Sequence, residues 1–170
     1  MEDIRGLDIL IQKLNKAEKS EVPSLLKSLQ LPKEDFDNFA SWSDDGYTRN
    51  CVHRTDTYEL ILLCWSKGCV TPIHGHGGQE CWVYQIEGNL TEKRFEKNAS
   101  GELVEIETLT LQAGDLTYME DRMGYHQLCN ESETKGYTLH LYVSPIDTCE
   151  IFNETTHSFE TKEMSYDTSL

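Results

Sequence analysis

The spacing of apolar residues divides the chain of 170 residues near residue 45. Before that point apolar residues recur at i, i+3, i+4 and i+7, at Leu7, Leu10, Ile11 and Leu14, which is the spacing of an amphipathic helix. A second apolar segment has Pro23 near its start, where a helix tolerates proline, and ends at Pro32. The run KEDFDNFASW follows as a short third helix. The pattern therefore predicts that residues 1–42 form N-terminal helices that pack on the rest of the molecule.

From residue 45 onward, short apolar runs alternate with turn residues. YELILLCW, CWVYQIEGN and GYTLHLYVS are examples of such runs. Short strands separated by turns about every 8–12 residues are typical of a sandwich or barrel. We expect a mainly β, single-domain chain with a β-barrel over residues 43–155. Residues 156–170 are polar and are expected to form a C-terminal tail.

Charge and cysteine content narrow the classes of partner and compartment. The formal net charge is −15, from 30 acidic and 15 basic residues, so nucleic acid and anionic membranes are poor partners. No apolar run reaches the ~18 residues that span a bilayer, and the start MEDIRGLDIL lacks the order of a signal peptide. We expect a cytoplasmic protein whose six cysteines are reduced.

Three histidines form the candidate metal site. His74 and His76 stand at i and i+2, so on an extended strand both imidazoles point to the same face. The stretch from Gly68 to Gly88 resembles the first motif of the cupin superfamily, and the stretch from Gly114 to His126 resembles the second. Imidazole ligands suit iron, zinc, copper or nickel, so the ligand type leaves the metal open.

Two adjacent residues could occupy the position of the usual fourth cupin ligand. Cupins commonly carry a glutamate after the two histidines, and this chain has Glu80 and Cys81 side by side. The spacing to Gly88 favours Cys81 in that register. Adjacent strand residues face opposite ways, so we predict that Cys81 faces the interior and Glu80 faces outward. The site would then hold three neutral imidazoles and no carboxylate.

Several motifs in order across residues 47–149 resemble cysteine dioxygenase. They are Tyr47-Thr48-Arg49-Asn50, Leu63-Cys64-Trp65, His74-Gly75-His76 with Cys81, Gly124-Tyr125-His126, Thr138-Leu139-His140-Leu141-Tyr142 and Asp147-Thr148-Cys149. The resemblance implies a cupin-type β-barrel that oxidises L-cysteine with O2 to cysteine sulfinic acid. It implies Fe(II) as the cofactor and a monomer as the working state.

The resemblance also implies roles for individual residues. His74, His76 and His126 would bind Fe(II). Arg49 would hold the substrate carboxylate, since a guanidinium pairs with a carboxylate through two hydrogen bonds. Tyr47 would line the same pocket.

A second group of implied roles centres on Tyr142. Cys81 and Tyr142 would form the family's thioether crosslink, and His140 and Thr138 would support Tyr142. Thr138, His140 and Tyr142 alternate along one strand and so share a face. Alternation alone favours an ordinary amphipathic strand with this polar face in solvent, whereas the resemblance favours an inward polar face. Two departures stand out: Thr138 replaces a serine, and Val143-Ser144-Pro145 stands where the family has Ser-Pro-Pro.

Other functions fit part of the pattern. A related thiol dioxygenase would use 3-mercaptopropionate or cysteamine, although Arg49 and Cys81 favour free cysteine. A non-enzymatic metal-binding cupin would need the histidines but none of Arg49, Cys81 and Tyr142. A zinc hydrolase or isomerase is a weaker third option, because no general base is recognisable.

Overall fold

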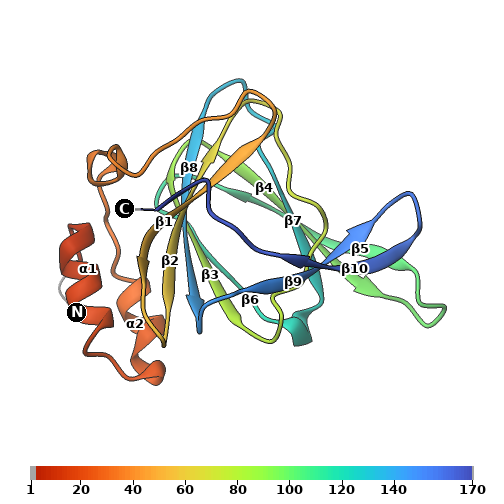
Figure 1. Ribbon diagram of the computed structural model, residues 1–170, viewed down its shortest axis with the longest axis horizontal. Coiled ribbons are helices and arrows are strands. Elements are labelled where there is room, and N and C mark those ends of the chain that lie inside the picture. Colours follow the sequence, from red (N-terminus) through yellow and green to blue (C-terminus); the bar gives the residue numbers. More distant parts are fainter. Residues whose placement is uncertain (1–2, 170) are drawn as a thin grey trace.

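A computed structural model describes residues 3–169 and shows a β-barrel with short helices on one side (Figure 1). The helical elements are α1 (Leu7–Leu14), η1 (Lys19–Glu21), α2 (Val22–Leu26) and η2 (Lys33–Phe36), and a further turn, η3 (Asp121–Met123), lies between strands. Pro23 stands in the first turn of α2, where its missing N–H costs no helical hydrogen bond. The predicted helical N-terminal region is therefore confirmed as a set of short helices.

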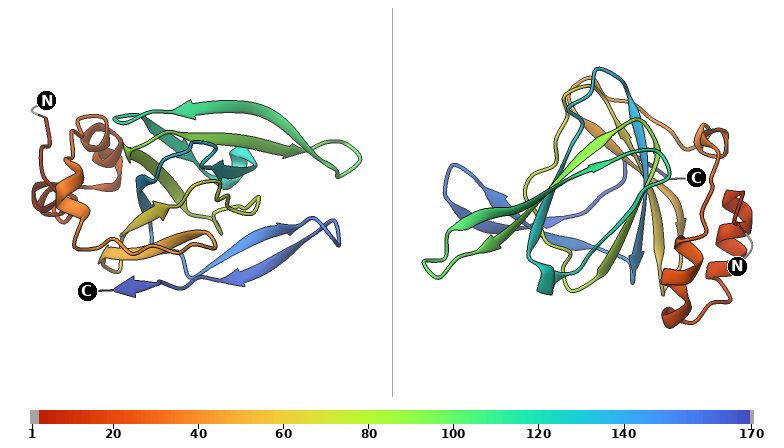
Figure 2. Two further views of the ribbon diagram at one scale, coloured as in Figure 1. Left: turned by 90° about the horizontal axis from the view of Figure 1, so that it is seen from above. Right: turned by 180° about the vertical axis from the view of Figure 1, so that it is seen from behind.

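The strands form three sheets. The six-stranded sheet has the order β11 (Thr168–Ser169), β1 (Tyr47–Arg54), β2 (Glu59–Trp65), β8 (Gly136–Val143), β3 (Glu80–Glu87) and β6 (Leu116–Met119). The three-stranded sheet has the order β5 (Leu103–Leu111), β4 (Leu90–Lys97) and β7 (Tyr125–Cys129), and β9 (Thr148–Asn153) pairs with β10 (Ser158–Glu163). The hairpin β4–β5 and the pair β9–β10 extend away from the N-terminal helices (Figures 1 and 2).

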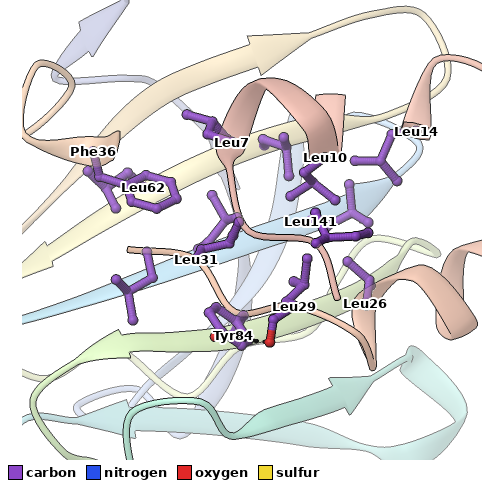
Figure 3. Packing of buried hydrophobic residues seen from close by; sticks show 14 of the residues in the cluster. Leu7, Leu10, Leu14, Leu26, Leu29, Leu31, Phe36, Leu62, Tyr84 and Leu141 are labelled. Atoms are coloured by element: carbon purple, nitrogen blue, oxygen red, sulfur yellow. Dashed lines mark hydrogen bonds between the residues drawn. The ribbon is translucent and has the colours of Figure 1, made fainter. Parts of the chain in front are cut away.

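Strand β2 shows how the barrel acquires its two faces. Every residue of β2 is buried, and after Glu59 the strand is a continuous apolar run without polar alternation. Leu60 and Leu62 pack outward against the helices, in a cluster with Leu10 and Phe36 (Figure 3). Ile61 and its same-face neighbours point into the barrel interior. The helices therefore cover the outer face of the sheet and leave the interior for the site.

The C-terminal region differs from its prediction as a polar tail. Residues 158–163 form β10, and residues 168–169 form β11 parallel to β1. The side chains of β10 are mostly exposed, which explains the polar composition, because strand pairing uses backbone groups and needs no apolar face. The expectation for residues 156–169 was wrong, and Leu170 lies outside the described residues.

Two further sequence expectations concern cysteines and membranes. All six cysteines are free thiols in the structure. None of the helices formed by residues 3–169 has the length and apolar character needed to span a bilayer.

Candidate metal centre

Three imidazoles converge inside the barrel. His74 and His76 lie in the loop between β2 and β3, and His126 lies on β7. His126 Nε2 is 3.1 Å from His76 Nε2 and 3.2 Å from His74 Nε2. The three ring nitrogens lie within 4.8 Å of one another, which is the arrangement of three ligands around one ion.

Backbone contacts hold the loop against β7. The amides and carbonyls of His74 and His126 exchange two hydrogen bonds, of 3.0 and 3.1 Å. The His76 amide donates to Asp121 Oδ1 at 2.9 Å, and the Gly78 amide donates to Asp121 Oδ2 at 2.6 Å. The backbone pairing of His74 with His126 and the Asp121 carboxylate therefore hold together histidines that are far apart in the sequence.

Hydrogen bonds to the far ring nitrogens fix where the protons lie. His74 Nδ1 is 2.9 Å from the carbonyl oxygen of Pro72, and His126 Nδ1 is 2.7 Å from Glu92 Oε1. Both acceptors lack a proton to donate, so each Nδ1 carries a hydrogen and each Nε2 is the atom that faces the other histidines. Burial and the neighbouring His126 lower the pKa of His74 to about 3, so no second proton occupies that ring.

The donor set therefore fits a metal ion. The Nε2 atoms of His74 and His126 face each other at 3.2 Å, and a cation bound at that point would accept an electron pair from each. Burial lowers the pKa of His76 well below its ordinary value, so His76, like His74, is neutral. Neutral imidazole is the form that coordinates metals.

Glu92 on β4 was missed in the sequence. Its side chain is fully buried, it accepts from His126, and its other oxygen accepts from Thr117 Oγ1 at 2.7 Å. Arg94 also reaches it, at 3.4 Å. Leu90 and Glu92 are two residues apart on β4, so their side chains share a face, and Leu90 is buried. This alternation could have predicted an inward Glu92, but the polar run TEKR suggested an exposed strand.

Cys81 and Tyr142 lie opposite each other on β3 and β8. Burial raises the pKa of the Cys81 thiol, and the neighbouring Tyr142 opposes that rise. Cys81 is fully buried, whereas Glu80 is partly exposed and pairs with Lys19 at 2.9 Å. The alternation along the strand thus places Cys81 inside and Glu80 outside, as predicted.

The polar face of β8 points into the barrel. The indole nitrogen of Trp65 donates to Thr138 Oγ1 at 2.8 Å, and the Thr138 hydroxyl lies 2.9 Å from His140 Nε2. Since that hydroxyl already accepts from Trp65, its own hydrogen is available to His140. Burial lowers the pKa of His140 well below its ordinary value. The rival reading of β8 as a strand with its polar face in solvent is wrong.

A cavity beside the histidines contains a cationic group. It is lined by Tyr47, Arg49, His74, His140, Tyr142 and Met164, among others. Arg49 is buried, and its Nη1 donates to the Ser165 carbonyl at 2.7 Å. Its Nη2 is buried without a hydrogen-bond partner among residues 3–169. The cavity therefore offers an unused donor to an anionic group.

Comparison with known proteins places this site in a family. The cysteine dioxygenase type I family model matches residues 4–155. The chain belongs to the cysteine dioxygenase type I family. It is 31% identical to cysteine dioxygenase type 1 of Rattus norvegicus over 140 residues, covering 80% of this chain and 70% of that protein. The Danio rerio cysteine dioxygenase type 1 is 32% identical over 152 residues, covering 86% and 75%. The chain is accordingly a thiol dioxygenase, an oxidoreductase.

Solved structures support the fold. The chain superposes on KdgF from Halomonas sp. with a TM-score of 0.52 and 19% identity, covering 65% of this chain and 92% of that one. A Klebsiella pneumoniae protein with a double-stranded β-helix domain gives a TM-score of 0.53 at 14% identity, covering 75% and 86%. The predicted cupin-type barrel is confirmed.

The structure also places residues beside the cavity that the sequence did not predict. Met164 and Lys162 reach the cavity from the C-terminal segment. Asp167 Oδ2 accepts from the Arg49 amide at 2.7 Å. Reading residues 156–170 as a tail concealed these contacts. At the departure from Ser-Pro-Pro, the Val143–Ser144 peptide bond is cis.

Proposed function

We propose that this cysteine dioxygenase family member oxidises L-cysteine with O2 to cysteine sulfinic acid at Fe(II) held by His74, His76 and His126. The observation that carries the proposal is the buried Arg49 Nη2, which has no partner within the described chain and lies in a cavity shared with His74. A buried cationic donor without an acceptor is costly. A carboxylate bound there satisfies it.

The three imidazoles suit the proposed ion. Neutral nitrogen ligands leave its full charge in place, and Fe(II) bound there supplies the open coordination positions and redox chemistry that thiol oxygenation requires. Every other role belongs to the side chains around it.

Arg49 and Tyr47 form the carboxylate end of the proposed substrate site. The Ser165 carbonyl accepts from the Arg49 guanidinium, and the main-chain N–H and carbonyl of Arg49 are both hydrogen-bonded to Asp167. The fork is therefore oriented before substrate arrives, which reduces the entropic cost of binding. Placing the carboxylate at Arg49 directs the other end of a small amino acid toward His74, the metal ligand that lines the same cavity.

Tyr142 is the proposed polar group at the reacting end. Burial raises the pKa of its hydroxyl well above the ordinary value, so it remains a hydrogen-bond donor rather than a phenolate. The Trp65–Thr138–His140 chain below it holds His140 in one orientation, with the His140 and Tyr142 rings 6.4 Å apart between centroids. We propose that this hydroxyl orients the bound reactants.

We further propose that Cys81 and Tyr142 form a thioether. Their directly opposed positions on β3 and β8 and their place in one buried cluster favour it. The crosslink joins the sulfur to a ring carbon and releases one hydrogen from each, a two-electron oxidation for which O2 is the oxidant. The crosslinked protein should be lighter than its sequence mass by two hydrogen atoms.

The surroundings of the site bear on the partners. A net charge of −15 repels phosphate backbones and anionic membranes, so the local positive charge of Arg49 favours a small anion. We propose a monomeric, cytoplasmic enzyme that acts on a small thiol amino acid.

A substrate panel tests the proposal. Iron-loaded protein would be supplied with cysteine, 3-mercaptopropionate or cysteamine, and oxygen uptake and sulfinate would be measured. Cysteine should give the highest kcat/KM and one sulfinate per O2 consumed. A higher kcat/KM for 3-mercaptopropionate or cysteamine would show that cysteine is not the preferred substrate. No sulfinate from any thiol, with iron bound, would favour a metal-binding cupin without this activity.

A further inference from the structure

The three histidines differ in what their outer ring nitrogens contact. His74 Nδ1 faces a neutral carbonyl, that of Pro72. His76 Nδ1 is buried with no hydrogen-bond partner in the described chain. His126 Nδ1 faces a carboxylate, that of Glu92, at 2.7 Å. One ligand of three therefore has a negative charge behind it.

The Glu92 carboxylate is held from both sides. Both oxygens accept hydrogen bonds, from His126 and from Thr117, and the side chain is fully buried. Arg94 Nη2 donates to Thr117 Oγ1 at 2.8 Å and to the Tyr118 carbonyl at 3.2 Å, which fixes the cation beside the carboxylate. Arg94 Nη2 also lies 3.4 Å from Glu92 Oε2, so two hydrogen-bond donors and one cation surround the carboxylate.

A charged carboxylate on an imidazole N–H changes the opposite nitrogen. The hydrogen bond draws the proton outward, which raises electron density at Nε2 and makes it a stronger donor to a metal. It also locks the ring orientation and the tautomer. The same charge, buried where screening is weak, favours the more positive oxidation state of a nearby ion.

We propose that Glu92 is a positioning residue of the metal centre, which fixes the Nδ1–H form of His126 and lends negative charge to the metal through that ring. The site is then three imidazoles plus one outer carboxylate, in place of three equivalent neutral ligands. The inference rests on the proposed metal site but not on the identity of the thiol.

Glu92→Gln tests the proposal with a near-isosteric side chain that keeps an oxygen acceptor and removes the charge. Fe(II) affinity would be measured by anaerobic competition with a chelator, and the Fe(III)/Fe(II) midpoint potential by redox titration without thiol. We expect affinity to fall about 10- to 100-fold and the midpoint potential to rise. Unchanged affinity and potential in folded Glu92→Gln protein would overturn the proposal.

Glu107→Gln is the matched control. Glu107 contacts the other side of Arg94 at 3.3 Å, and about half of its side chain is exposed, so the same loss of charge should leave both quantities unchanged. If Glu107→Gln changes affinity and midpoint potential as much as Glu92→Gln does, the effect comes from the loss of any nearby negative charge, and the proposal is overturned.

Two outcomes separate this inference from the proposed function. Wild-type protein that binds Fe(II) but oxidises no thiol would refute the function alone, and the affinity of Glu92→Gln would still decide the role of Glu92. If Glu92→Gln does not fold, Glu92→Asp keeps the charge but withdraws it from His126. Weaker iron binding by that variant is expected, and wild-type affinity would overturn the proposal.

Discussion

Arg49 is a buried cation that the protein satisfies only in part. Nη1 is bound to Ser165, whereas Nη2 has no acceptor among the described residues. A surface arginine would exchange partners with water and show no preference for a ligand. This one lines a cavity in a fixed orientation, so we propose that selectivity for an acid depends on it.

Replacing Arg49 should weaken cysteine binding without disturbing the metal. Charged hydrogen bonds to a buried partner contribute about 2–5 kcal/mol, so Arg49→Ala should raise KM for cysteine by at least about 30-fold. Arg49→Lys keeps the charge but loses the planar fork and should show a smaller increase. Steady-state kinetics with iron analysis checks this; marked iron loss in either variant would argue against a substrate role.

Thr138 links Trp65 to His140 through one hydroxyl. Thr138→Val keeps the shape and removes the hydroxyl, which leaves the Trp65 N–H and His140 Nε2 unpaired. We expect a lower kcat with little change in KM or iron content, because only the orientation of Tyr142 is affected. Thr138→Ser should restore kcat, and a Thr138→Val enzyme with wild-type kcat would remove this chain from the mechanism.

At the scale of elements, the turn before β7 delivers His126 to the site. Gly124 has φ +90°, and a Cβ on it would collide with the Phe95 carbonyl oxygen on β4. Only glycine therefore allows the turn to approach β4 so closely.

Gly124→Ala should both destabilise the fold and lower metal occupancy. The added Cβ forces the backbone to move at a position only two residues before the ligand His126. Gly114→Ala is the control, since Gly114 has φ +95° but a Cβ there meets nothing within 4 Å in the described part of the chain. The control should lose only about 1 kcal/mol from backbone strain. Urea unfolding and bound-iron measurements compare the two; equal losses would show that the Phe95 contact is unimportant.

The C-terminal segment is held to the barrel through a buried carboxylate. The Tyr166 hydroxyl donates to Glu59 Oε2 at 2.8 Å, and Arg54 donates to both groups. Burial raises the pKa of Glu59, although Tyr166 and Arg54 oppose that rise. The ionised form of Glu59 therefore depends on Arg54 of β1 and on Tyr166 of the segment between β10 and β11.

Tyr166→Phe should destabilise the protein in a pH-dependent way. Losing one donor to a buried charge costs about 1–3 kcal/mol and raises the folded-state pKa of Glu59 further. The raised pKa costs stability only where unfolded Glu59 is ionised, so the deficit should be largest near neutral pH and shrink below pH about 4. Urea unfolding at both pH values, repeated in Glu59→Gln protein where the deficit should be smaller, checks this. A pH-independent deficit would contradict it.

At the scale of the whole molecule, the metal site joins separate parts of the barrel. His74 and His76 lie in the loop before β3, whereas His126 lies in the other sheet, on β7. An ion bound by all three should cross-link the two sheets. A bound ion would thus stabilise the fold as well as serve as a cofactor.

Removing the metal should lower thermal stability. Saturation at 100 times Kd contributes about 2.7 kcal/mol, which corresponds to about 5–11 °C for a chain of this size. Scanning calorimetry of chelator-treated and iron-loaded protein should show that difference, and His126→Ala protein should show little. If iron does not change the melting temperature, the ion does not stabilise the fold by joining the two sheets.

The sequence predicted the barrel, the helices and the inward residues, because these follow from local periodicity and motif order. Cys81 and the Thr138–His140–Tyr142 face depended on strand parity together with the family resemblance. The role of Glu92 was not predicted because its partner His126 is remote in sequence. The C-terminal strands were not predicted because they are held by backbone pairing and by a contact with the buried Glu59. Neither leaves a pattern of apolar residues, so the polar composition was taken to indicate a tail.

The central claim is that the chain transfers both atoms of O2 to the sulfur of cysteine at the three-histidine site. The most direct test is turnover of cysteine under ¹⁸O2 with mass analysis of the product. The account predicts cysteine sulfinic acid carrying two ¹⁸O atoms, and no labelled product from His126→Ala protein. A product with one labelled oxygen, with oxygen from water, or formed equally by that variant would contradict it.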